Sequence, residues 1–123
     1  MVVRIEEVQP VLMTRDVAAA LAFYRRLGFA LACVDTPEAP RYAAVRRDGV
    51  ELHLQWHAVA EWEPATDRPT YRFVVSDVDA LSEELSDPTL DRTPARDTPW
   101  GTRELHVRDP DGNGLHFYRA RSG

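Results

Sequence analysis

The sequence contains no lysine, a single cysteine and no apolar run long enough to cross a bilayer. All 15 basic residues are arginine, which excludes a Schiff-base lysine and the lysine of a phosphate-binding loop. Cys33 has no second cysteine with which to form an internal disulfide, and its place in FALACV predicts a buried strand position. Arg4, Glu6 and Glu7 stand where a signal peptide needs a basic and then an apolar segment. We therefore expect a soluble, cytoplasmic protein without a membrane partner.

Basic residues are also fewer than acidic ones: the sequence has 15 basic and 20 acidic residues, and the net charge is −5. Phosphate contacts need a basic surface, so a nucleic-acid partner is disfavoured and a cationic ligand is favoured. Sequence signatures of serine hydrolases, cysteine hydrolases, phosphate-binding loops and dinucleotide-binding folds do not occur. The length of 123 residues is sufficient for a single domain with its own core.

The first half of the chain predicts a strand, a helix and three further strands. An apolar strand is expected over Val8–Met13, and Asp16 then stands as an N-cap before VAAALAFYRRLGF. Gly28 stands where a helix C-cap glycine belongs, and Asp48-Gly49 predicts a hairpin. The remaining predicted elements are a helix over Val17–Arg26 and strands over Phe29–Val34, Tyr42–Arg46 and Val50–Trp56.

The second half repeats this plan after a polar linker over residues 58–69. YRFVV predicts a strand, Asp77 caps a helix over Val78–Ser86, and RELHV and GLHFY predict strands on either side of a DPDG turn. RDVAAAL aligns with SDVDALS, and DGVELHLQ aligns with DGNGLHFY. We therefore predict an α+β fold of eight strands in two tandem βαβββ modules, residues 1–57 and 70–121, that form a curled mixed sheet around a groove.

These motifs resemble the vicinal oxygen chelate superfamily, which includes glyoxalases, extradiol dioxygenases and bleomycin-resistance proteins. The resemblance rests on VLMTRDVAAALAFYRRLGF, DGVELHL and TPWGTRELHVRDPDGNGLHFY, and it covers nearly the whole chain. TPWGTRE before DPDGN is most similar to the bleomycin-resistance branch. That branch implies a homodimer that binds a cationic glycopeptide antibiotic in a groove between subunits, without chemistry.

The resemblance also implies where a metal would bind, because metal-dependent relatives place ligands seven residues before each capping aspartate and on the last strand of each module. These positions are occupied here by Gln9, Glu51 or His53, Thr70 and His116. Thr70 carries a neutral hydroxyl, which is a poor ligand for a transition-metal ion. We expect no metal cofactor; if a divalent metal binds, the ligands expected are Gln9, His53 and His116. The two histidines are otherwise expected to hydrogen-bond a polar ligand from the pocket wall.

Aromatic and charged side chains complete the predicted ligand site. Loop tryptophans stack on planar or cationic groups, and Trp100 is the best placed of three. Arg103 alternates with Glu104 on a strand, so one of the two should face inwards; Arg103 could hold an anionic ligand or pair with Glu51. The predicted ligand-binding residues are Gln9, Glu51, His53, Trp56, Trp62, Thr70, Trp100, Arg103 and His116.

We therefore predict a small-molecule-binding protein that sequesters a cationic or aromatic antibiotic of the bleomycin kind without catalysis. Two alternatives stay open. One is a metal-dependent lyase, isomerase or dioxygenase of the glyoxalase type. The other is a metabolite-binding module, which the sequence does not separate from drug sequestration because both of these need only a shaped pocket.

Overall fold

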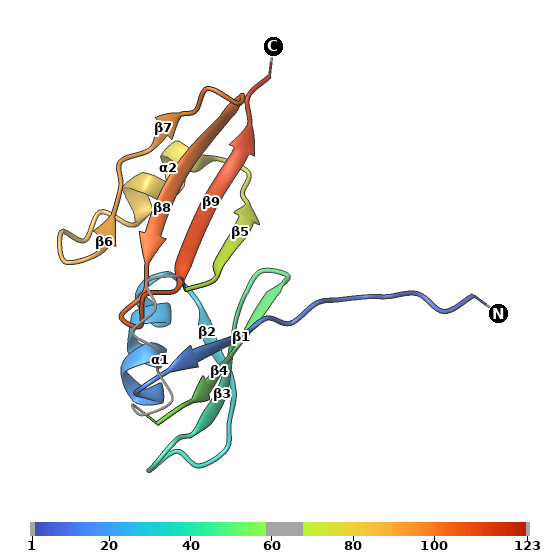
Figure 1. Ribbon diagram of the computed structural model, residues 1–123, viewed down its shortest axis with the longest axis vertical. Helices are drawn as coiled ribbons and strands as arrows, with labels where there is room; N and C mark the ends of the chain where they lie inside the picture. Colours follow the sequence, from blue (N-terminus) through green and yellow to red (C-terminus); the bar gives the residue numbers. More distant parts are fainter. Residues whose placement is uncertain (1, 59–67, 123) are drawn as a thin grey trace. The chain divides into compact units, whose positions relative to one another are not determined.

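The computed structural model of the protein describes residues 2–58 and 68–122. The chain divides into two compact units, residues 1–59 and 60–123, and the described residues of each unit form one sheet and one α-helix (Figure 1). Each unit also contains one of the two modules predicted from the repeat.

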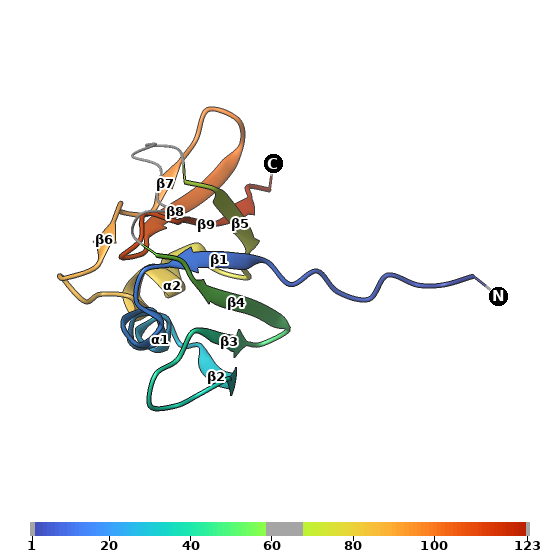
Figure 2. The ribbon, with the colours of Figure 1, turned by 60° about the horizontal axis from the view of Figure 1, so that its bottom comes forward.

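The first unit is a four-stranded mixed sheet with a helix on one face, and Figure 2 shows its strands side by side. The sheet order is β1-β4-β3-β2, with β1 parallel to β4 and the other pairs antiparallel. Its elements are β1 (Val11–Thr14), α1 (Val17–Arg26), β2 (Ala30–Val34), β3 (Tyr42–Arg47) and β4 (Val50–Trp56).

The second unit repeats this order as β5-β9-β8-β6, again with the first strand parallel to the last. A further short strand, β7, pairs with β8. The elements are β5 (Thr70–Val74), α2 (Val78–Glu84), β6 (Asp91–Arg92), β7 (Arg96–Asp97), β8 (Thr102–Arg108) and β9 (Gly114–Ala120). The predicted α+β class and the βαβββ duplication are confirmed.

The predicted helix caps are present in both units. The Asp16 carboxylate accepts a 3.0 Å hydrogen bond from the amide of Ala19, and Asp77 does the same for Ala80. Gly28 follows the end of α1 with φ of +87°, a conformation that glycine adopts without the strain of a Cβ atom. The second helix ends at Glu84, two residues before the predicted end.

Each helix packs on one face of its own sheet. In both units the strand residues toward the helix are apolar and buried, and burial of each of the larger side chains, those other than Ala43, contributes about 1.5–3 kcal/mol. These strand residues are Ala43, Val45, Leu52 and Leu54 in the first unit, and Leu105, Val107, Leu115 and Phe117 in the second. Side chains alternate along a strand, so the residues between them lie on the face that the helix leaves uncovered.

Three sequence predictions require correction. Cys33 is exposed rather than buried, because β2 is the edge strand of its sheet and its register shifts between Leu31 and Cys33. The described residues form nine strands rather than eight, since the loop after α2 contains the two-residue strands β6 and β7. The first strand begins at Val11 rather than Val8, and its ladder is preceded by Pro10, which has no amide hydrogen to donate.

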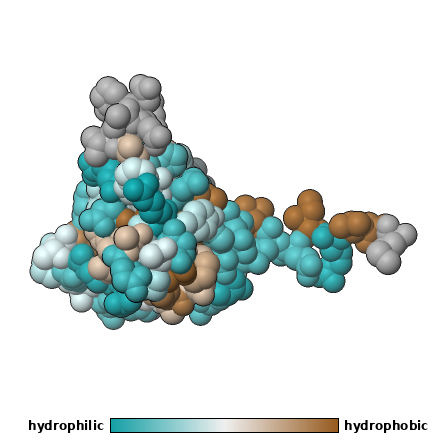
Figure 3. Space-filling model, turned by 90° about the horizontal axis from the view of Figure 1, so that it is seen from below, coloured by the Kyte–Doolittle hydropathy of each residue, from teal (hydrophilic) through white to brown (hydrophobic). Residues whose placement is uncertain are grey.

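The segment before β1 carries exposed apolar side chains. Val2, Val3, Ile5 and Val8 are between 78% and 91% exposed, and Figure 3 shows hydrophobic side chains along this segment. Glu7 contacts the first sheet through an ion pair of 3.2 Å with Arg46. Among the described residues, none of the helices has the length and apolar character that crossing a membrane requires.

Candidate functional site

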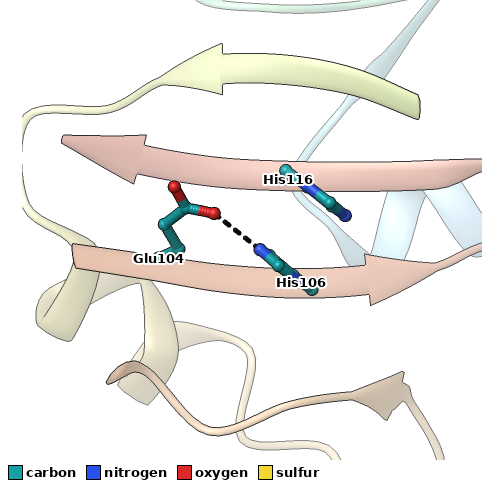
Figure 4. Close-up of side chains that lie close together, drawn as sticks. All are labelled: Glu104, His106 and His116. Atoms are coloured by element: carbon teal, nitrogen blue, oxygen red, sulfur yellow. Dashed lines mark hydrogen bonds and ion pairs between the residues drawn. The ribbon is translucent and has the colours of Figure 1, made fainter. Parts of the chain in front are cut away.

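The polar residues of the second unit gather on the sheet face opposite α2. Arg72 on β5, Glu104 and His106 on β8, and His116 and Tyr118 on β9 share this face, as their cross-strand pairing and the burial of their neighbours show. We call this set the open face. Figure 4 shows Glu104, His106 and His116 projecting from the two adjacent strands toward one another.

Glu104 is the centre of this face, although its side chain is only 1% exposed. Its Oε2 atom accepts hydrogen bonds from Arg72 Nη2 at 3.0 Å, Trp100 Nε1 at 3.2 Å and Thr102 Oγ1 at 2.6 Å. Its Oε1 atom lies 2.7 Å from His106 Nε2. A buried carboxylate is stable only with such partners, so one acidic residue fixes four neighbouring side chains.

The charge of Glu104 follows from these contacts. Burial alone would raise the pKa of Glu104, but hydrogen bonds from Arg72, His106, Thr102 and Trp100 outweigh it and hold that pKa far below the ordinary value for a glutamate. The group is therefore a carboxylate at neutral pH. Arg72 also lies with its guanidinium carbon 3.9 Å from the centre of the Tyr118 ring, which extends the planar surface of the open face.

His106 and His116 stack face to face on β8 and β9. Their ring centroids are 3.5 Å apart and their planes differ by 4°, because the two residues are direct cross-strand partners. Burial lowers the pKa of His116 below its usual value, and the nearby His106 lowers it further. Two imidazolium ions this close would repel each other, so the pair is favoured with at most one charge.

The turn between β8 and β9 sets this register. Asp109 Oδ1 accepts hydrogen bonds of 2.9 Å from the amides of Asp111 and Asn113, and Asp109 Oδ2 accepts one from Asn113 Nδ2. Gly112 adopts a φ of +86°, which favours glycine. The DPDGN motif therefore acts as a buried hydrogen-bonded turn that places His116 opposite His106.

A cleft of about 410 Å³ lies beside the stacked histidines. His106, His116 and Thr70 line it together with three arginines, Arg68, Arg92 and Arg108, and one carboxylate, Asp91. Arg92 also holds α2, through hydrogen bonds to the Ser82 and Leu85 carbonyl oxygens. The wall of the cleft is thus polar, with an excess of positive charge.

The first unit has a smaller counterpart of this arrangement. Glu51 Oε2 lies 2.9 Å from His53 Nε2, and the Tyr42 hydroxyl lies 2.6 Å from His53 Nδ1. Arg46 forms an ion pair of 3.1 Å with Glu51. His53 therefore corresponds to His116, but its cross-strand partner is Ala44 rather than a second histidine.

Several of the predicted site residues lie at or beside the open face. His116 belongs to it, Thr70 lines the adjoining cleft, and Trp100 is bonded to Glu104 while its side chain remains largely exposed. Arg103 lies on the opposite, helix-covered side, where it pairs with Asp79 at 2.8 Å and Asp97 at 3.0 Å. Of the alternating pair, Glu104 faces the site.

The other predicted residues belong to the first unit or fall outside the described residues. Glu51 and His53 share one sheet face, whereas Trp56 alternates with them and lies under the guanidinium of Arg41, 4.1 Å from its ring centre. Gln9 is exposed and precedes β1. Trp62 lies outside the described residues.

Sequence reasoning missed Glu104, His106 and Arg72 as site residues. The alternation in RELHV places Glu104 and His106 on one face, and the alignment of GLHFY opposite RELHV pairs His106 with His116, so this signal was available. Arg72 had no such signal, because its role depends on β5 lying beside β9.

Comparisons with known proteins show the family and the fold of this chain. The family described as Glyoxalase/Bleomycin resistance protein/Dioxygenase superfamily matches residues 4–117. The bleomycin-binding protein from bleomycin-producing Streptomyces verticillus, solved as a complex with copper(II)-bleomycin, is 31% identical, with 99% of this chain and 100% of that chain covered and a TM-score of 0.76. Curated protein sequences give no match.

Two other solved structures share the fold at lower identity. A bleomycin resistance determinant encoded on the transposon Tn5 is 20% identical with a TM-score of 0.78, and 96% of this chain and 100% of that chain are covered. A glyoxalase/bleomycin resistance protein/dioxygenase from Nocardioides is 23% identical with a TM-score of 0.77, and 100% of this chain and 88% of that chain are covered.

Proposed function

Since the chain belongs to the glyoxalase, bleomycin resistance protein and dioxygenase superfamily, we propose that it binds and sequesters an antibiotic of the bleomycin kind and leaves it chemically unchanged. The observation that carries this proposal is the similarity, over nearly the full length of both chains, to a protein solved with copper(II)-bleomycin bound. Sequestration of the drug would make the protein an antibiotic-resistance factor.

The open face of the second unit supports this proposal with planar surfaces for a planar ligand. Trp100 is 68% exposed, and its indole nitrogen is tied to Glu104, so the ring is held while its face is free to stack. Tyr118 with Arg72, and the His106–His116 pair, add two more stacked surfaces on the same sheet face. A net charge of −5 adds long-range attraction for a cationic drug.

We also propose that the protein acts as a homodimer. Leu31 on β2 is 49% exposed and Val11 on β1 is 46% exposed, and these two strands are at the ends of the sheet formed by the described residues, so their edges and apolar side chains are suited to contact with a second copy. The exposed apolar residues before β1 add to this surface. Because the only cysteine cannot form an internal disulfide, a reducing compartment is suitable, and we propose the cytoplasm.

A second candidate function is the binding of an anionic metabolite. The observation that favours it is the cleft beside His106 and His116, which Arg68, Arg92 and Arg108 line against the single carboxylate of Asp91. An anionic ligand would bind there through charge-assisted hydrogen bonds, whereas a cationic drug would have to rely on the planar surfaces around Trp100. The two functions therefore predict ligands of opposite charge.

Tryptophan fluorescence distinguishes these candidates. Titration with bleomycin should quench the protein's fluorescence in a saturable way, whereas free N-acetyltryptophanamide, the control for collisional quenching, should respond linearly. Raising the salt concentration should weaken the interaction, since part of the attraction is screened charge. Linear quenching of the protein, together with saturable quenching by small di- or tricarboxylates, would refute the antibiotic-binding proposal in favour of the metabolite-binding one.

A further inference from the structure

Two imidazoles and one carboxylate converge on the open face. Glu104, His106 and His116 each offer a ligand atom, and these atoms all lie within 4.8 Å of one another. We propose that these three side chains bind a divalent transition-metal ion such as Zn²⁺ or Co²⁺. Imidazole nitrogens favour such ions over Mg²⁺ and Ca²⁺, which prefer sites made of oxygen alone.

The ligand atoms lie close enough together for small side-chain shifts to bring them around one ion. Two ligands that each lie about 2.1 Å from a zinc ion at the tetrahedral angle are about 3.4 Å apart. The ligand atoms of Glu104, His106 and His116 lie within 4.8 Å of one another, and the two imidazole ring centroids are 3.5 Å apart. Since a metal ion lies near the plane of each imidazole, the two parallel rings must tilt toward each other on binding.

The third ligand is already beside the first. Glu104 Oε1 lies 2.7 Å from His106 Nε2, so the metal would replace the proton of this hydrogen bond and move the two atoms about 0.7 Å further apart (Figure 4). Glu104 Oε2 stays occupied by the donors of Arg72, Trp100 and Thr102. These three bonds orient the carboxylate and leave Oε1 for the ion, as outer-shell hydrogen bonds do at metal sites.

The site has room for further ligands of the ion. His106 and His116 both line the cleft of about 410 Å³, so water or a small molecule could complete the coordination from that side. Three protein ligands beside an open space differ from a closed structural zinc site, in which the protein supplies all four ligands. The arginines of the same cleft would favour an anionic group in the remaining position.

This site differs from the set Gln9, His53 and His116 considered from the sequence, because all three of its ligands come from two neighbouring strands of one unit. The first unit provides a natural comparison. His53 has a carboxylate neighbour in Glu51, but Ala44 stands opposite it where His106 stands opposite His116. Within the described residues, the three-ligand group occurs only in the second unit.

The test is a metal titration of the full chain, freed of metal by a chelator and dialysed, in the absence of any antibiotic. Co²⁺ binding is followed by visible absorption and Zn²⁺ binding by calorimetry. We expect saturable binding, a loss of affinity of about tenfold or more in His106→Ala and His116→Ala, and a change below about twofold in the matched control His53→Ala. Circular dichroism checks that each variant is folded.

Glu104→Gln is a weaker test, because it removes a buried charge on which the fold depends. If the Glu104→Gln variant does not fold, the two histidine variants still test the proposal. Absence of saturable Co²⁺ or Zn²⁺ binding would overturn the proposal. A loss in His53→Ala as large as in His116→Ala would also overturn it. Because no drug is present, the metal titration does not test antibiotic binding, which the fluorescence titration tests separately.

Discussion

The indole nitrogen of Trp100 donates a 3.2 Å hydrogen bond to the carboxylate of Glu104, four residues further along the chain. The bond joins a largely exposed aromatic ring to a buried anion. A ring held in this way loses little conformational entropy when a ligand stacks on it, which favours its use as a binding surface.

Trp100→Ala should weaken bleomycin binding roughly tenfold, because one stacking contact of about 0.5–2 kcal/mol is removed. Trp100→Phe separates the two roles of the indole, since it keeps an aromatic face and removes the bond to Glu104. Calorimetric titration of both variants measures the change. Arg103→Ala is a control on the helix-covered face of the same sheet and should leave the affinity unchanged. Parent-like binding by Trp100→Ala would mean that the indole has no ligand role.

Glu104→Gln should lower the free energy of unfolding by about 2 kcal/mol at pH 7, since hydrogen bonds to a charged acceptor are replaced by weaker ones. The pKa of Glu104 is lowered on folding from a reference value of 4.5, so its stabilisation is complete above about pH 4.5 and is lost as the pH falls below it. The difference between variant and parent should therefore shrink under acid conditions.

Urea denaturation of metal-free protein between pH 7 and pH 3 measures this dependence, with Glu83→Gln, an exposed change on α2, as the control. A difference that stays constant over this range would show that the charge of Glu104 does not stabilise the fold.

The fold was largely predictable because its signals are local. Asp16 and Asp77 cap the helices, Asp48-Gly49 joins β3 to β4, and the repeated motifs place equivalent strands in both units. The two-residue strands β6 and β7 were missed, since pieces so short have no hydrophobic alternation to detect.

The site was less predictable because it depends on partners across strands. His116 and Trp100 were selected from motifs, but the role of Glu104 follows from donors on three separate segments, and no sequence spacing encodes the approach of Arg72 from β5. The side chains of Arg103 and Glu104 point to opposite faces of the sheet. The ion pair of Arg103 with Asp79 on α2 shows that Arg103 is on the helix side and Glu104 on the open face. Cys33 was misplaced because an apolar strand at the edge of a sheet has the same composition as a buried one.

The protein should be a dimer at micromolar concentration, because the exposed apolar residues at its strand edges and N-terminal segment favour burial against a second copy. Light scattering coupled to size-exclusion chromatography measures the mass, which is 14.0 kDa for one chain. Leu31→Glu on the edge strand β2 should shift the equilibrium toward monomer if that edge takes part. A parent protein that remains monomeric at these concentrations would rule out a groove formed between subunits.

The central claim, binding without chemistry, is tested most directly by calorimetric titration with bleomycin followed by mass spectrometry of the drug recovered from the denatured complex. The account predicts saturable binding that weakens with added salt, and recovered drug of unchanged mass after prolonged incubation. Recovered drug of altered mass would contradict sequestration and indicate an enzyme. Absence of binding heat at any salt concentration, in folded protein, would contradict the assignment of the ligand itself.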